Sequence, residues 1–161
     1  MTWAQLQSDG TSDGVLARQY AADGSPQGAA FGVSDSSITP ASQQSEPALG
    51  LDADGDFAIT WVANAVYVDY GAILGRRYAA DGTPLGVAFP VSTLQTDVTY
   101  YPALAMGADG SFVAAWDSRL ADDPVRVHVN AAVFGIAVPQ PTAARFGTAS
   151  YTVEEGPDRR S

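Results

Sequence analysis

The segment Tyr20-Ala-Ala-Asp-Gly-Ser-Pro-Gln-Gly28 returns further along the chain as Tyr78-Ala-Ala-Asp-Gly-Thr-Pro-Leu-Gly86. Each copy places Asp-Gly two residues before a proline, and glycine supplies the positive φ that tight hairpin turns require. A turn signal that recurs at a fixed distance is typical of repeat architectures. The two segments therefore predict hairpins that belong to equivalent structural units.

The tryptophans define the length of the unit. Trp3 lies 17 residues before Tyr20, as Trp61 lies 17 residues before Tyr78. The period is 58 residues from Trp3 to Trp61 and 55 from Trp61 to Trp116. Other motifs recur in the same phase: Phe-x-Val-Ser at 31–34 and 89–92, Pro-Ala-Leu at 47–49 and 102–104, and Asp-Gly-x-Phe at 54–57 and 109–112. A third copy decays after Trp116, so we expect a fragment of a longer protein with two complete units.

Within a unit the apolar residues alternate with a period of two, which is the pattern of a β-strand. Phe57, Ile59 and Trp61 share one face, and Phe112, Ala114 and Trp116 share the equivalent face of the next copy. The best-preserved unit predicts four short strands separated by turn residues, near 47–51, 57–61, 72–78 and 87–92. No segment shows the pattern of an amphipathic helix, so the chain is expected to be all-β.

The connection lengths favour one arrangement of these strands. In an up-and-down meander the Asp-Gly turns all lie at one rim, and the longer connections 35–46, 62–71, 93–101 and 117–124 lie at the other. Repeated four-stranded sheets of this size are what a β-propeller uses for its blades. We therefore predict tandem four-stranded antiparallel sheets in a partial β-propeller-like arc of about two and a half blades. Trp61 and Trp116 are expected in equivalent buried positions against Phe57 and Phe112.

Composition excludes several classes of partner. The chain has 161 residues, eight arginines, no lysine and eighteen acidic residues, for a net charge of −10. Nucleic-acid binding needs clustered basic residues, so nucleic acid is not an expected partner. No apolar stretch approaches the ~20 residues of a membrane helix, so no membrane insertion is expected. Met1–Gly10 does not resemble a secretory signal, and an export signal would lie outside this chain.

The repeated pattern Arg-x-Tyr-x-Ala-Asp-Gly-x-Pro-x-Gly, followed by Phe-x-Val, Pro-Ala-Leu and Asp-Gly-x-Phe, resembles a repeat of very large exported bacterial proteins. Such proteins often carry haemolysin-type calcium-binding repeats or cadherin-like modules. The resemblance implies a β-repeat region over 1–137 and an extracellular or cell-surface location. It also implies further repeats of the parent chain as partners, beside an unknown extracellular protein or glycan.

A second resemblance lies near the C-terminus. After a proline-containing linker at 138–143, the segment Phe146-Gly-Thr-Ala-Ser-Tyr-Thr-Val-Glu-Glu-Gly156 resembles the opening strand of a Calx-beta domain, a calcium-binding β-sandwich. Residues 144–161 are therefore interpreted as the truncated first strand of such a domain. By position, Glu155 matches a glutamate of that family that takes part in calcium binding. The resemblance makes calcium possible in the full-length protein, and no cofactor is expected in this chain.

Few residues could carry chemistry. Asp52, Asp54 and Asp56 form an alternating run of carboxylates, which can ligate calcium, but the next copy retains one of the three and a plain hairpin turn is the favoured interpretation. His128 is the only histidine. It alternates with valines and is interpreted as a solvated strand residue on the side opposite the apolar face. No catalytic residue is predicted, because a nucleophile, a base and its orienting group cannot be assembled.

The long connections hold the candidate ligand-binding residues Tyr67, Asp69, Tyr70, Tyr100 and Tyr101. Aromatic rings beside acids can bind sugars or peptides by stacking and hydrogen bonding, and packing between blades is the competing explanation. The function predicted first is a non-enzymatic extracellular repeat region of a large bacterial protein, with an adhesion or spacer role. The alternative is a glycan-binding or glycan-cleaving β-propeller.

Overall fold

The chain forms three antiparallel sheets in a computed structural model, which describes residues 1–6, 13–34, 43–64, 71–92, 97–120, 123–135 and 148–151. The first sheet holds β1 (Thr2–Leu6), β2 (Asp13–Tyr20) and β3 (Pro26–Gly32). The second holds β4 (Gln43–Leu51), β5 (Phe57–Asn64), β6 (Gly71–Tyr78) and β7 (Phe89–Pro90). The third holds β8 (Asp97–Met106), β9 (Phe112–Leu120), β10 (Asp123–Phe134) and β11 (Thr148–Tyr151).

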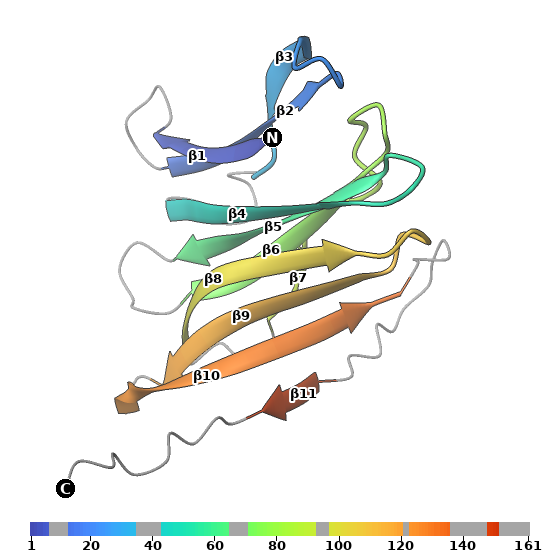
Figure 1. Cartoon of the computed structure of the whole chain (residues 1–161). Helices are drawn as coiled ribbons and strands as arrows, with labels where there is room; N and C mark the ends of the chain where they lie inside the picture. The colour runs from blue at the N-terminus through green and yellow to red at the C-terminus, as the bar shows by residue number, and fades with distance from the viewer. Residues whose placement is uncertain are drawn as a thin grey trace, which may run out of the picture.

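The sheets stack face to face in chain order, and the strands within each sheet also follow chain order (Figure 1). No helix occurs among the residues that the structure describes. The predicted all-β class and partial propeller-like arc are therefore confirmed.

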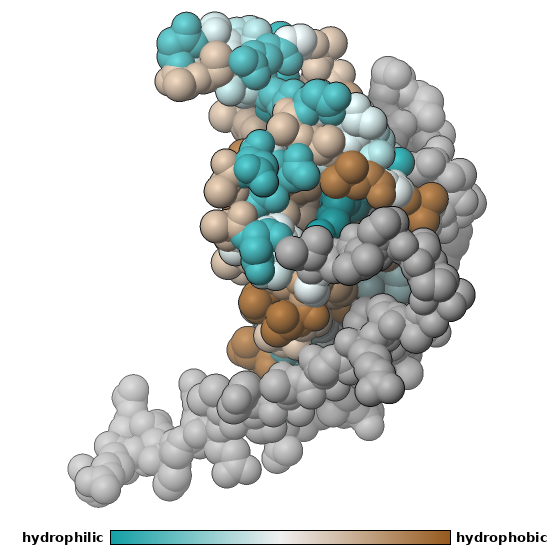
Figure 2. Space-filling view, turned by 90° about the vertical axis from the view of Figure 1, so that its right-hand side faces the viewer, coloured by the Kyte–Doolittle hydropathy of each residue, from teal (hydrophilic) through white to brown (hydrophobic). Residues whose placement is uncertain are grey.

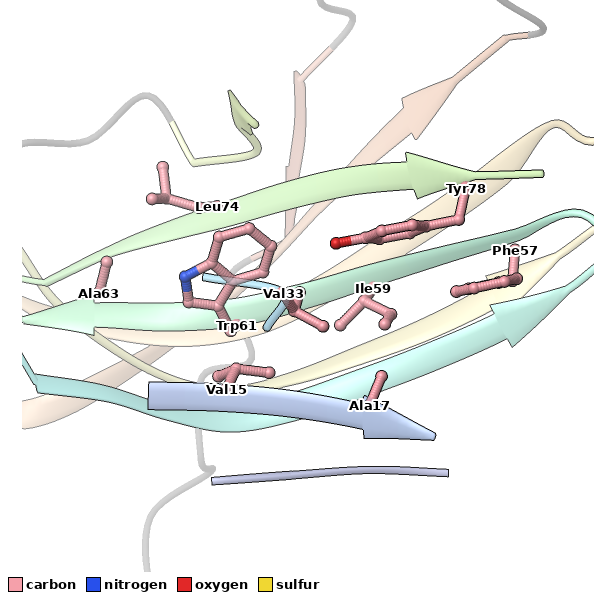
Figure 3. Packing of buried hydrophobic residues seen from close by; sticks show 9 residues of the cluster. All are labelled: Val15, Ala17, Val33, Phe57, Ile59, Trp61, Ala63, Leu74 and Tyr78. Carbon is pink, nitrogen blue, oxygen red and sulfur yellow. The ribbon is translucent and has the colours of Figure 1, made fainter. Parts of the chain in front are cut away.

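Two apolar cores hold the stack together. The core between the first and second sheets contains Val15, Ala17, Val33, Phe57, Ile59, Trp61, Ala63, Leu74 and Tyr78 (Figure 3). The core between the second and third sheets contains Ala58, Val62, Ile73, Val91, Phe112, Ala114, Trp116 and Ala132. Trp61 and Trp116 are 1% and 5% exposed in these cores, each beside the phenylalanine of its own strand, as the sequence predicted. Burying a side chain of this size contributes about 1.5–3 kcal/mol.

The repeated Arg-x-Tyr motif closes a hairpin in each of the first two sheets. Arg18 Nε donates to the Gly28 carbonyl at 2.9 Å, and Arg76 Nε donates to the Gly86 carbonyl at 3.0 Å. Each guanidinium also lies 5.8 Å from the centre of the tyrosine ring two residues on. The motif therefore recurs because its arginine crosses between neighbouring strands and covers an aromatic ring.

The Asp-Gly turns lie together at one end of the stack, which we call the turn rim (Figure 1). Asp23, Asp81 and Asp109 each accept a hydrogen bond from the backbone N–H two residues on, at 2.8–3.0 Å. Hydrogen bonds from the side chain and backbone of that residue hold the pKa of all three exposed carboxyls below the ordinary value. Gln19 Nε2 donates to the Ala80 carbonyl at 2.7 Å, which links the first two sheets at this rim.

The third sheet keeps the geometry of the repeat where its sequence has changed. Phe134 stacks on Phe112 at 4.6 Å and 14°, as Tyr78 stacks on Phe57 at 4.9 Å and 8°. β11 pairs antiparallel with β10 and takes the last position of this sheet. The assignment of 144–161 to a separate Calx-beta-like domain stays a prediction, and the linker at 138–143 lies outside the described residues.

The predicted environment of His128 is wrong. Val127 and Val129 are 44% and 52% exposed on the outer face of β10, and the His128 ring points toward the second sheet with a buried Nε2. The sequence predicted correctly that His128 alternates with the valines, but it assigned the two sets of side chains to the wrong faces of the sheet. The reason is that the outer face of the third sheet is uncovered, so the valines lie in solvent.

Candidate ligand-binding rim

Two strained bulges interrupt β4 and β8, each near the middle of its strand. The pairing register shifts between Ser45 and Ala48 in β4 and between Tyr100 and Ala103 in β8. Inside these bulges Glu46 has φ 52° and Tyr101 has φ 53°, the two positive values among the described non-glycine residues. Such values are rare outside glycine and are typical of functional sites, where the surrounding structure enforces them.

The bulges are equivalent in the repeat and touch each other. Glu46 and Tyr101 directly precede Pro47 and Pro102, and a residue before proline has a restricted backbone. β4 and β8 are the first strands of the second and third sheets and are in contact. The Tyr101 N–H donates to Glu46 Oε2 at 2.6 Å. This charge-assisted bond holds the left-handed conformation of Tyr101 from the neighbouring sheet.

The Tyr101 side chain is presented to solvent. It is 68% exposed, and its ring lies 5.9 Å from the Tyr100 ring at an interplanar angle of 37°. We call the surface around Glu46, Tyr100 and Tyr101 the bulge rim.

Asp117 lies on the outer face of the third sheet. It is directly opposite Tyr100 and Val129 in the register and is half-buried. Burial raises its pKa above the ordinary value, and the nearby Arg119 opposes this effect in part. Its Oδ1 is buried without a hydrogen-bond partner.

A row of buried polar groups lies beside the bulge rim, on the face of the third sheet toward the second. Thr99, Ser118 and His128 are aligned across β8, β9 and β10. Thr99 Oγ1 and His128 Nε2 are buried without partners, as is Trp116 Nε1. Asn130 Nδ2 donates to Ser118 Oγ at 2.9 Å. Buried polar atoms of this kind are normally met by water or ligand.

The residues predicted from the sequence are distributed unequally. Tyr100 and Tyr101 lie on the bulge rim, whereas Tyr67, Asp69, Tyr70 and Glu155 lie outside the described residues. Sequence reasoning missed Glu46. Glu46 occupies the place of Tyr101 in the preceding unit, directly before Pro-Ala-Leu, so the repeat alignment carried the signal for it.

The predicted aspartate run lies at the turn rim. Asp52 Oδ1 accepts from the Asp54 N–H at 3.0 Å, and Asp56 Oδ1 accepts from the Ala80 N–H at 2.9 Å. Within the described ranges no three His, Cys, Asp or Glu side chains are grouped as a metal site. A calcium site at Asp52, Asp54 and Asp56 therefore stays a prediction without support from the geometry. The described part of the chain has no helix long and apolar enough to cross a membrane.

Comparison with known proteins identifies the class of fold. No model of a known protein family matches the chain, and no curated protein matches it. The chain is similar in structure to the endo-arabinase from Bacteroides thetaiotaomicron VPI-5482, with a TM-score of 0.55 and 17% identity. The match covers 92% of this chain and 56% of the arabinase chain, so this chain spans little more than half of that structure. The likeness shows a propeller-like fold.

The comparison also corrects the function predicted first. A non-enzymatic adhesion or spacer region was expected, whereas the endo-arabinase that this chain resembles in structure is a glycan-cleaving enzyme. The resemblance to haemolysin-type repeats found no counterpart among the comparisons. The comparison favours the alternative, a glycan-binding or glycan-cleaving β-propeller.

Proposed function

We propose that the bulge rim binds a glycan outside the cell. The observation that carries this proposal is Tyr101, an aromatic residue 68% exposed and held in a left-handed conformation by a carboxylate of the next sheet. The left-handed backbone of Tyr101 costs free energy and leaves the ring exposed. Such a cost is expected where the ring contacts a ligand.

The chemistry of the rim fits a carbohydrate. A sugar ring has apolar C–H faces that stack on aromatic rings, and hydroxyl groups that donate to carboxylates. Tyr100 and Tyr101 supply the aromatic surface, and Glu46 supplies an acceptor beside it. The net charge of −10 disfavours acidic glycans, so a neutral polysaccharide is the class of ligand. The structural likeness to an endo-arabinase supports arabinan as the first probe.

The likeness to an endo-arabinase makes cleavage of the bound glycan a second candidate. Glycosidases use two carboxyl groups, and among the described residues the bulge rim has one, Glu46. Incubating the chain with arabinan and measuring new reducing ends separates this candidate from the absence of catalysis that the sequence predicted.

The binding test is titration calorimetry of the whole chain with linear arabinan. Tyr101→Ala is expected to weaken binding about tenfold, because a stacked aromatic contributes roughly 1.4 kcal/mol. The matched control is Tyr20→Ala, which removes a 41% exposed tyrosine at the turn rim and is expected to leave affinity unchanged. EDTA is expected to have no effect, since no metal ligand is assigned to the rim. Equal affinity of the wild type and Tyr101→Ala would remove the basis of the proposal.

A further inference from the structure

The outer face of the third sheet carries an uncovered row of valines. These are Val113, Val127, Val129 and Val133, which are 41%, 44%, 52% and 63% exposed. They alternate along β9 and β10 with residues that pack against the second sheet. Viewed from the turn rim, the first-sheet end of the molecule is mainly hydrophilic, and strongly hydrophobic residues gather toward the third sheet (Figure 2). A contiguous apolar face of this kind marks an interaction surface.

The repeat shows what normally covers this face. Tyr20, Tyr78 and Phe134 end equivalent strands, and five residues before each lie Val15, Ile73 and Val129. Val15 is 1% exposed beneath the second sheet, and Ile73 is fully buried beneath the third. Val129 is the equivalent residue of the third sheet and is 52% exposed. A further sheet of the same repeat would therefore pack on this uncovered face.

The first sheet carries the matching surface on its outer side. Trp3 pairs with Leu16 across β1 and β2, as Trp61 pairs with Leu74 across β5 and β6. Trp61 and Leu74 share a core with Val15 of the preceding sheet. Trp3 and Leu16 are the equivalent pair on the first sheet, and they are only half-buried. The first sheet therefore exposes the kind of surface that packs on a valine elsewhere in the repeat.

We propose that two copies of this chain associate head to tail, with Trp3 and Leu16 of each copy packed on the valine face of the other. Each interface repeats the packing already present between the sheets of one chain. Two copies contribute six sheets, a number within the range of closed propellers, and a head-to-tail contact that closes on itself gives a ring.

The association is tested by sedimentation velocity on the whole chain over a range of concentrations. The wild type is expected to double its mass as concentration rises. Val129→Asp places a charge in the interface and is expected to give a monomer, whereas Val87→Asp, at an 81% exposed valine away from this face, keeps the dimer. Circular dichroism confirms folding of each variant, and Val133→Asp replaces Val129→Asp if the latter does not fold. A wild type that stays monomeric, or that grows beyond two copies, overturns the proposal.

A mixing experiment distinguishes head-to-tail from symmetric contact. Leu16→Arg alone is expected to abolish dimers, as Val129→Asp does. In a one-to-one mixture of the two variants, one interface joins the introduced arginine to the introduced aspartate and the other interface joins two unchanged faces, so dimers return at low salt. If the valine faces of two copies stacked on each other, Leu16→Arg alone would still dimerise, and that result contradicts the arrangement. Glycan binding is measured separately and does not enter this outcome.

Discussion

Replacing Tyr101 with glycine separates the strain in the β8 bulge from the binding proposed for its ring. A non-glycine residue in the left-handed region costs about 1–2 kcal/mol, and Tyr101 is held there with φ 53°. Glycine adopts this conformation freely and loses about 0.5–1 kcal/mol of conformational freedom on folding. The difference makes Tyr101→Gly more stable than Tyr101→Ala by up to about 1 kcal/mol.

Because Tyr101→Gly is compared with Tyr101→Ala, the effect of losing the tyrosine side chain cancels. Both variants lose the same tilted contact with Tyr100, 5.9 Å away, and both keep the backbone N–H that donates to Glu46. The ring is 68% exposed, so its removal changes little apolar burial. For a chain of this size, 1 kcal/mol corresponds to a shift of roughly 2–4 °C in Tm.

Urea unfolding followed by tryptophan fluorescence measures the difference. Ala103→Gly is the matched control, because Ala103 lies two residues further along β8 with an exposed side chain and no positive φ. There glycine is expected to destabilise by about 0.5–1 kcal/mol. If Tyr101→Gly is no more stable than Tyr101→Ala, the bulge does not hold a left-handed residue and the strain argument fails. Both Tyr101 variants are expected to lose glycan affinity equally.

Three further predictions concern the cores and the carboxyl groups. Phe134→Ala removes the ring stacked 4.6 Å from Phe112 and is expected to lower the unfolding free energy by about 2–3 kcal/mol; an unchanged urea midpoint would mean that the third sheet does not pack as described. Thr60→Val replaces a fully buried hydroxyl without a partner and is expected to raise stability by about 1 kcal/mol; a loss of stability would reveal a water or ligand bound there. Asp117 has a raised pKa in the folded state, so its stability contribution is present below the unfolded pKa of 3.8 and is lost as pH rises through the folded value. Asp117→Asn is therefore expected to gain stability relative to the wild type at neutral pH and not at pH 3, whereas Asp109→Asn, whose carboxyl has a lowered pKa, is expected to lose stability at neutral pH.

The strands could be predicted because their signals are local. The Asp-Gly turns and the alternation of Phe57, Ile59 and Trp61 define where β5 begins and which of its faces is apolar. Equivalent spacing in the next unit places Trp116 in the same way. These features depend on neighbouring residues in one chain segment, and the sequence displays them directly.

The bulge rim could be predicted only in part, because contacts between sheets create it. Neither glutamate nor tyrosine prefers a positive φ, so the residues at positions 46 and 101 do not predict a bulge. The bond from the Tyr101 N–H to Glu46 joins residues 55 positions apart, in two different sheets. Long-range pairing of this kind is invisible to a reading of periodicity.

The repeat behaves differently at its two rims. At the turn rim equivalent positions carry equal chemistry: Asp23 and Asp81 accept the same backbone hydrogen bond in the first and second sheets. At the bulge rim the backbone is repeated, with φ values of 52° and 53°, while the side chains differ completely. Glu46 offers a carboxylate where Tyr101 offers an aromatic ring. For the glycan site that we propose, this shared strained backbone means that each sheet contributes one kind of contact to a single ligand.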